Sequence, residues 1–304
     1  MKRALVFPGQ GSQFVGMGQD IFDTSQVVQE MYAKASDILG YDIADVTFNG
    51  PLEALTETRV TQPALFITSA ACFSLIPDGF EFQLVAGHSL GEYSALFAAG
   101  VLNFVDALSI VKVRAEGMQA ASQVQKGSMA AVLNLSRKDV EKVCQQASET
   151  GIVQAANFNS PGQIVISGEE AAVHKAMELA KALGARKVVE LNVSGAFHSP
   201  LMAPATEALR AAIAKATFNS AKVPVVANVD AAATTDPQTI QANLIQQLES
   251  PVLWEDSVET MLNNGITEFL EVGPGRVLQG LIRRIERGAG VAGISTREQL
   301  ETLL

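Results

Sequence analysis

Residues 83–93 constrain the fold of this chain more than any other stretch. The apolar run Leu84-Val85-Ala86 leads into Gly-His-Ser-Leu-Gly at residues 87–91, and residues 92–99 have the composition of a buried helix. An apolar run that turns sharply into a helix is typical of a strand–turn–helix unit in a parallel α/β sheet. The two glycines lack Cβ atoms, so the strand and the helix can approach closely. The sequence therefore predicts an α/β fold in which Ser89 stands on a tight turn above the sheet.

The same turn has the form of a nucleophile elbow, in which a serine hydroxyl is exposed at the top of a sheet. The amide of Leu90 would then lie at the N-terminus of the following helix, where partial positive charge favours an oxyanion. The alternative is a glycine-rich turn whose serine only caps the helix. The strand before the motif and the helix after it favour a catalytic nucleophile.

Composition sets the class of protein and of partner. The 304 residues leave room for one large domain or two unequal ones, and 48% apolar with 18% charged residues is typical of a globular protein. Lys plus Arg is 22 and Asp plus Glu is 32, so the net charge is −10 and we expect no nucleic-acid or membrane partner. Cys72 and Cys144 lack metal-ligand spacing, which predicts reduced thiols, a cytoplasmic location and no metal site.

The predicted elements alternate between strands and helices along most of the chain. They include a strand at residues 3–7, a helix at 19–39, and a helix that starts at Thr61 with Pro63 in its first turn. A further strand is predicted at residues 223–229. This alternation indicates a mostly parallel α/β sheet.

Residues 126–193 show a different pattern. Strands are predicted near residues 128–135, 153–158, 163–167 and 186–193, with helices at 136–148 and 169–183. This βαββαβ order is the ferredoxin-like or split βαβ pattern. The sequence therefore predicts an inserted subdomain at residues 126–193 within a larger domain formed by residues 1–125 and 194–304.

A serine nucleophile needs a base, and the chain has three histidines. His88 is adjacent to Ser89, so its side chain should point away from the hydroxyl. His174 lies among alanines in a predicted helix and is expected to be a structural or surface residue. His198 follows a strand, at the position where ligand sites of open α/β sheets gather. Elimination favours His198, and the alternative is a histidine that only marks the start of a helix.

No acidic third member of a triad is evident. The aspartates between the serine and His198 are Asp106 and Asp139, and neither has the strand-end context of a hydrolase acid. Either a carboxylate comes from elsewhere or a neutral acceptor orients the imidazole. A Ser–His dyad is the better hypothesis.

Arg114 is an anomaly in the predicted helix that follows residue 103. It shares one helical stripe with Ala107, Val111 and Met118. A guanidinium on an apolar stripe must extend its head to water or find an anion. The pattern leaves two alternatives open, a snorkelling side chain at the edge of the stripe or a buried arginine that awaits a carboxylate.

Five motifs in this order resemble those of the malonyl-CoA:acyl carrier protein transacylases. The resemblance runs from near residue 7 to about residue 285, and the joint order of the motifs is much more specific than any one of them. The motifs are Phe-Pro-Gly-Gln-Gly-Ser-Gln at residues 7–13, Gly-His-Ser-Leu-Gly-Glu-Tyr at 87–93, Val-Arg-Ala at 113–115, Asn-Ser-Pro-Gly-Gln at 159–163 and Glu-Val-Gly-Pro-Gly at 271–275.

The resemblance implies a catalytic apparatus. Ser89 would be the acylated nucleophile and His198 its base, oriented by the backbone carbonyl of Gln247. The amides of Gln10 and Leu90 would form the oxyanion hole.

The resemblance also implies a substrate pocket. Arg114 would hold the malonyl carboxylate, and Gln62 would lie beside the acyl group. Phe197, in Gly-Ala-Phe-His, matches the malonyl-selective form of the motif, since related methylmalonyl-selective domains carry a smaller residue there. The implied fold is a hydrolase-like α/β core with the inserted ferredoxin-like subdomain.

The implied partners are malonyl-CoA and holo acyl carrier protein, with no cofactor because the coenzyme A thioester is a substrate. We expect a monomer that supplies fatty-acid biosynthesis; a trans-acting polyketide acyltransferase and a serine thioesterase or esterase are the alternatives. A module that docks carrier protein without chemistry is a third hypothesis, and the intact Ser89 and His198 argue against it.

Overall fold

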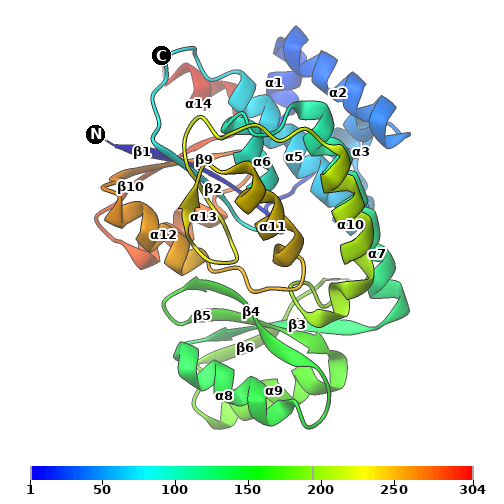
Figure 1. The fold of residues 1–304 in the computed structure, drawn as a ribbon, viewed down its shortest axis with the longest axis vertical. Coiled ribbons are helices and arrows are strands. Elements are labelled where there is room, and N and C mark those ends of the chain that lie inside the picture. The colour runs from blue at the N-terminus through cyan, green and yellow to red at the C-terminus, as the bar shows by residue number, and fades with distance from the viewer. Residues whose placement is uncertain (1, 194, 303–304) are drawn as a thin grey trace.

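The computed structural model describes residues 2–193 and 195–302 and contains two separate sheets (Figure 1). A six-stranded sheet has the order β10-β9-β1-β2-β7-β8, and every neighbouring pair in it is parallel except β7 with β8. A four-stranded antiparallel sheet has the order β4-β5-β3-β6. The predicted α/β class with a mostly parallel main sheet is therefore confirmed.

The element bounds are as follows. The strands are β1 Arg3–Phe7, β2 Leu84–Gly87, β3 Gly127–Leu133, β4 Val153–Ser160, β5 Gln163–Glu169, β6 Lys187–Glu190, β7 Val225–Val226, β8 Ala233–Thr234, β9 Glu268–Val272 and β10 Gly290–Ile294. The helices are α1 Gln19–Thr24, α2 Gln26–Leu39, α3 Ile43–Asn49, α4 Leu52–Thr56, α5 Thr58–Ser74, α6 Gly91–Ala98, α7 Phe104–Val124, α8 Arg137–Ala147, α9 Glu170–Ala182, α10 Ala203–Lys215, α11 Pro237–Gln247, α12 Trp254–Asn263, α13 Val277–Ile285 and α14 Arg297–Glu301, with a 3₁₀ turn at Pro200–Met202.

Helices cover both faces of the six-stranded sheet, and alternate side chains of β1 pack against helices on opposite faces. Leu5 and Phe7 belong to one apolar cluster with residues of α5, α6 and α7, whereas Ala4 and Val6 belong to another with residues of α12 and α13. Successive side chains of a strand point to opposite faces, so a strand buried on both faces must be apolar throughout. The uninterrupted apolar run of β1 follows from this.

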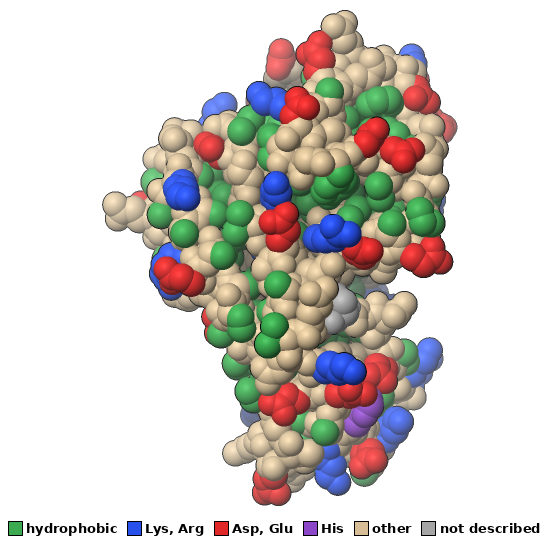
Figure 2. Space-filling view, turned by 90° about the vertical axis from the view of Figure 1, so that its right-hand side faces the viewer, with side chains coloured by type: hydrophobic (Ala, Val, Ile, Leu, Met, Phe, Trp, Pro, Cys, Tyr) green, Lys and Arg blue, Asp and Glu red, His purple; other side chains and the backbone are tan. Residues whose placement is uncertain are grey.

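The four-stranded sheet forms a smaller unit with a core of its own. Ala130 and Val132 of β3 pack with α8 and α9, whereas Met129 of the same strand packs with the larger unit. Figure 1 shows α8 and α9 on the face of this sheet that points away from the six-stranded sheet. In the space-filling view the molecule narrows between the two units, and acidic and basic side chains are interspersed on that face (Figure 2).

Two predicted helices have different bounds in the structure. The helix expected at residues 19–39 is two helices, because Ser25 is extended and its hydroxyl accepts from the Val28 amide as the N-cap of α2. The start at Thr61 is wrong, since α5 begins at Thr58 and Pro63 lies inside it. Proline cannot donate to the carbonyl four residues earlier, and the hydroxyl of Tyr41 donates to that carbonyl, of Arg59, at 3.3 Å.

The remaining predictions about strands, helix caps and boundaries compare with the structure as follows. The strand predicted at residues 223–229 is paired only over Val225–Val226 of β7. Asn103 and Ser136 cap α7 and α8 as predicted. Ser194, where the second domain boundary was predicted, lies outside the described residues. None of the helices in the described ranges is long and apolar enough to cross a membrane.

Candidate active site

The elbow is built by β2, α6 and the turn between them. Ser89 has a φ of 51°, a left-handed conformation that costs a non-glycine residue about 1–2 kcal/mol. A Cβ on Gly87 would lie 1.9 Å from the backbone of Gly91, and one on Gly91 would lie 2.1 Å from the carbonyl oxygen of Phe7. The two glycines are therefore needed for close approach of the strand, the helix and the loop after β1.

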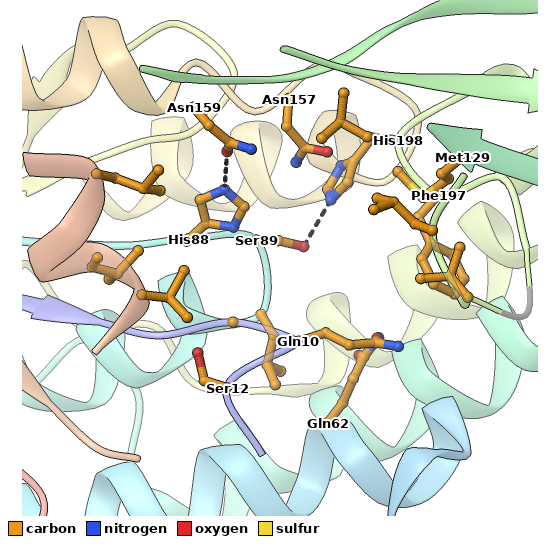
Figure 3. A pocket seen from close by; sticks show the side chains of 18 of the residues that line it. Gln10, Ser12, Gln62, His88, Ser89, Met129, Asn157, Asn159, Phe197 and His198 are labelled. Atoms are coloured by element: carbon orange, nitrogen blue, oxygen red, sulfur yellow. Dashed lines mark hydrogen bonds between the residues drawn. The ribbon is translucent and has the colours of Figure 1, made fainter. Parts of the chain in front are cut away.

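A chain of hydrogen bonds runs from Ser89 through His198 to α11. Ser89 Oγ and His198 Nε2 are 2.7 Å apart, and the dashed line in Figure 3 marks this contact. His198 Nδ1 lies 2.9 Å from the carbonyl oxygen of Gln247 and 3.2 Å from that of Ser250. Because both carbonyls are acceptors, Nδ1 carries the proton and Nε2 is free to accept one from the serine.

Burial keeps the His198 imidazole neutral. The side chain is 3% exposed, and burial together with the nearby Arg114 cation lowers its pKa to about 3. Its ring contacts two backbone carbonyls and no described carboxylate, which agrees with the expectation of a neutral acceptor. Asp106 and Asp139 bond instead to the N-cap residues of their own helices, Asn103 and Ser136.

Arg114 is buried beside the serine, so the snorkelling alternative is wrong. It is 1% exposed, and its Nη1 donates to Gln62 Oε1 at 2.7 Å. Its Nη2 donates to Ser89 Oγ at 3.1 Å and to Gln247 Oε1 at 3.0 Å. These acceptors are all neutral, and no described carboxylate lies within 4 Å of the guanidinium. The buried Nε has no hydrogen-bond partner among the described residues, so the site holds a desolvated cation with no described counter-ion in contact.

Glu92 is a buried carboxylate that acts electrostatically on Arg114, and sequence reasoning missed it. It is 1% exposed, its Oε2 accepts from Gln247 Nε2 at 2.9 Å, and burial raises its pKa to about 7. An acidic residue in the first turn of a helix is usually explained by its favourable interaction with the helix dipole, so the sequence did not indicate that the Glu92 side chain points into the protein. The signal available in the sequence was an acidic residue within a helix whose other residues carry no charge.

A cavity of about 190 Å³ opens over Ser89 and His198. Gln10, Gln62, Leu90 and Phe197 line it, as do Met129, Asn157 and Asn159 from the four-stranded sheet (Figure 3). No described group accepts a hydrogen bond from the amides of Gln10 or Leu90. Free amides next to the serine are suited to bind an oxyanion.

The other two histidines lie where the sequence indicated. His88 points away from the serine hydroxyl, with its Nε2 2.8 Å from Asn159 Oδ1 (Figure 3). His174 is on the smaller unit, and its Nε2 is 3.2 Å from Glu190. Within the described residues no group of His, Cys, Asp and Glu side chains could hold a metal ion.

The family model for the acyl transferase domain matches residues 4–299 of this chain. The chain is 46% identical over 284 residues to the malonyl CoA-acyl carrier protein transacylase of Escherichia coli strain K12, covering 93% of this chain and 92% of that protein. The protein of the same name from Bacillus subtilis strain 168 is 42% identical over 302 residues, covering 99% of this chain and 95% of its own. The chain belongs to the malonyl-CoA:acyl carrier protein transacylase family.

Solved structures of this family have the same fold. The malonyl CoA-acyl carrier protein transacylase from Coxiella burnetii superposes with a TM-score of 0.95 at 40% identity, covering 99% of this chain and 96% of that one. A malonyl-transacylase in complex with a type II PKS acyl-carrier protein superposes with a TM-score of 0.96 at 40% identity, covering 100% and 99%. The family resemblance expected from the five motifs is confirmed over nearly the whole chain.

Proposed function

We propose that this chain transfers a malonyl group from malonyl-CoA to the phosphopantetheine thiol of acyl carrier protein. The observation that carries the proposal is Arg114, a buried guanidinium that contacts no carboxylate of the described residues and whose Nη2 lies 3.1 Å from the Ser89 hydroxyl. A planar guanidinium can bind a carboxylate through two parallel charge-assisted bonds. A thioester with a free carboxylate two carbons from its carbonyl supplies this partner.

In the first half-reaction, Ser89 Oγ attacks the thioester carbonyl carbon while its proton moves to His198 Nε2. The amides of Gln10 and Leu90 stabilise the negative charge on the carbonyl oxygen. The tetrahedral intermediate then breaks its carbon–sulfur bond, and coenzyme A leaves as a thiol with the proton from His198. The product is malonyl-Ser89.

The second half-reaction reverses these steps with another thiol. The carrier phosphopantetheine gives its proton to His198 as its sulfur attacks the acyl-serine, and Ser89 recovers that proton when its ester bond breaks. Gln247 orients the imidazole through its carbonyl, and Gln62 and Phe197 shape the acyl pocket. These steps require no cofactor, because the activated acyl group arrives on the substrate.

We further propose a hydrolase-like catalytic domain of residues 1–125 and 194–304 with a ferredoxin-like subdomain at 126–193. Support comes from the βαββαβ element order and from the strand order β6-β3-β5-β4, the antiparallel arrangement of that motif. We also propose a monomer in the cytoplasm, and the two free, buried cysteines are consistent with a reducing compartment. A second candidate, transfer to a polyketide carrier, is favoured by the likeness to a malonyl-transacylase in complex with a type II PKS acyl-carrier protein.

The test is intact-protein mass spectrometry after brief exposure to malonyl-CoA, followed by addition of holo carrier protein. We expect one malonyl adduct on Ser89 that moves to the holo carrier and not to the apo carrier, which lacks the thiol. Release of free malonate in place of transfer would identify a thioesterase, and absence of any adduct would refute the proposal.

A further inference from the structure

Asn228 spans the elbow from the neighbouring strand and has no role in the mechanism above. Its Oδ1 accepts from the Ser89 amide at 2.7 Å, and its Nδ2 donates to the Gly87 carbonyl at 2.7 Å. The residue is 0% exposed. One side-chain amide therefore bonds to the backbone on both sides of His88.

The register of the sheet explains this geometry. Strand β2 pairs in parallel with β7, with Val85 opposite Val225 and Ala86 opposite Val226. Two more residues in the same register bring Asn228 opposite His88. In a parallel ladder, the backbone of one residue bonds to the two residues that flank its partner. Here the side-chain amide of Asn228 makes the equivalent pair of bonds, to Gly87 and Ser89. The Asn228 side chain thus continues the hydrogen-bond ladder of β2 and β7 beyond their last paired residues, Ala86 and Val226.

The backbone of Asn228 is itself held on two sides. Its amide donates to Glu92 Oε2 at 3.0 Å, and its carbonyl accepts from the Leu253 amide at 2.9 Å. The same Glu92 oxygen accepts from Gln247 Nε2, which also donates to the Ser89 carbonyl at 3.0 Å. Both backbone polar groups of Ser89 are thus bonded to one buried network.

We infer that Asn228 is a positioning residue for the nucleophile, holding Ser89 in its left-handed conformation and thereby setting the direction of Oγ and of the Leu90 amide. A left-handed serine persists only where its surroundings fix it, and a side chain with one donor and one acceptor at this spacing fixes both flanking peptides. The inference rests on the proposed function, because it concerns the same serine.

The first variant to test is Asn228→Ala, which removes both bonds. A misplacement of about 1 Å at a reacting atom costs roughly 100-fold in rate, so we expect the rate constant for Ser89 acylation by malonyl-CoA to fall about 100-fold. The amplitude of the acylation burst should stay near one per chain, because the folded enzyme still holds its serine and base. Asn243→Ala is the matched control, since Asn243 is a buried asparagine whose side chain donates to Asp230 rather than to the elbow.

The second variant, Asn228→Asp, adds a readout that a purely structural role would not move. When protonated, its carboxyl group can accept from the Ser89 amide and donate to the Gly87 carbonyl, as the native amide does. When ionised, it repels that carbonyl. Burial and the adjacent Glu92 raise the pKa of such a carboxyl group. While the pH is above that pKa, the protonated fraction grows by up to about tenfold for each pH unit of acidification, and the acylation rate of Asn228→Asp relative to wild type should rise with it.

The other titratable groups near this network are Glu92, His88, Tyr93, Arg114, His198 and Asp230, and they are common to all variants. The ratio of Asn228→Ala to wild type cancels their contribution, whereas in Asn228→Asp the new carboxyl group and Glu92 titrate as a coupled pair. His198 stays neutral over this range because its pKa is lowered to about 3. Asn228→Ala should therefore show a flat ratio between pH 7.5 and 5.5, in contrast to Asn228→Asp.

Two results would overturn the inference while wild type acylates normally. One is an Asn228→Ala rate constant within about twofold of wild type, and the other is a lower burst amplitude with an unchanged rate constant, which indicates misfolded enzyme. A wild-type enzyme that forms no malonyl-Ser89 would refute the proposed function instead, so the two failures are distinct.

Discussion

The two sheets contribute to the site in different ways. The groups proposed to react, to bind charge or to orient the base belong to the larger unit, which contains the six-stranded sheet. Ser89 follows β2, Gln10 follows β1, and Arg114 and Gln247 lie on α7 and α11. The smaller unit contributes cavity wall from the middle of its strands, such as Met129 of β3 and Asn157 of β4. The carboxyl ends of parallel strands lie at one edge of the sheet, so the loops that follow them lie close together. The antiparallel sheet instead lines the cavity with side chains on one of its faces.

The interiors of the two units differ in the charged groups that they bury. The larger unit buries Glu92, Arg114 and His198 around one serine and shifts the pKa of each. Among the described residues, the buried polar side chains of the smaller unit are Ser128, Asn157, Asn159, Ser160 and Ser167, and none of them carries a charge. Chemistry that needs perturbed titration should therefore respond to changes in the larger unit, and carrier or substrate docking to changes at the cavity wall and surface.

The largest expected effect is that of Ser89→Ala, which should abolish the malonyl adduct because no other group replaces the nucleophile. Intact-protein mass spectrometry after exposure to malonyl-CoA measures this. Ser12→Ala is the control, because Ser12 also lines the cavity and should leave the adduct in place. An adduct of undiminished yield on Ser89→Ala would refute the assignment.

Next in size is His198→Ala, which should slow both half-reactions by roughly 10³-fold or more, since loss of the base of a serine nucleophile costs this much. Rapid-quench kinetics of acylation and of transfer measure the two steps separately. His174→Ala, on the smaller unit, should stay near wild type. The reverse result would move the base to His174 and break the contrast between the units.

Arg114→Ala should lower malonyl kcat/KM by two to four decades. Removing one partner of a desolvated charge pair costs roughly 3–5 kcal/mol, at about 1.4 kcal/mol per decade. Acetyl-CoA has no carboxylate and should not lose rate, and Arg114→Lys should rescue little because a point charge cannot reproduce the fork. Equal losses for both thioesters would make Arg114 a structural residue.

The pH dependence of acylation should show a displaced acid limb. Because the pKa of His198 is lowered to about 3, the imidazole stays neutral and active at pH 5, where a histidine of ordinary pKa would be about 30-fold depleted of its neutral form. Burial and the Arg114 cation cause the lowering, so Arg114→Ala should move the limb to higher pH. Acylation by acetyl-CoA, measured from pH 4 to 8, tests both; a wild-type midpoint near 6.5 would contradict the assignment.

The smallest expected effect is on carrier docking. Arg276, Arg283 and Arg287 around α13 and Arg186 and Lys187 on the smaller unit are exposed, and no described carboxylate pairs with them. Charge reversal there should raise the KM for an acidic carrier several-fold and weaken its salt dependence, with the malonyl-CoA half-reaction intact. Comparing the two sets shows which unit docks the carrier, and unchanged kinetics for both would exclude these residues.

Local features of the fold and the site were predictable from the sequence. Two glycines around a serine, after an apolar run, require a sharp strand–helix turn, and capping residues such as Asn103 mark helix starts. The break at Ser25 was not predicted, because a serine within a periodic helical pattern fits both a helix interior and a cap. The position of Pro63 was misjudged, because the hydroxyl of Tyr41 that takes up the carbonyl of Arg59 comes from a distant helix connection.

By itself, the sequence determined the α/β class and the sharp strand–helix turn at Ser89, which follow from short-range spacing, and it predicted His198 as the base by elimination. Only the tertiary structure decided between a snorkelling and a buried Arg114, because burial depends on what the rest of the chain packs against the helix. Only the structure showed Asn228 beside Ser89, 139 residues earlier in the chain. The register of parallel strands joined by long crossovers sets such contacts, and no local pattern encodes that register.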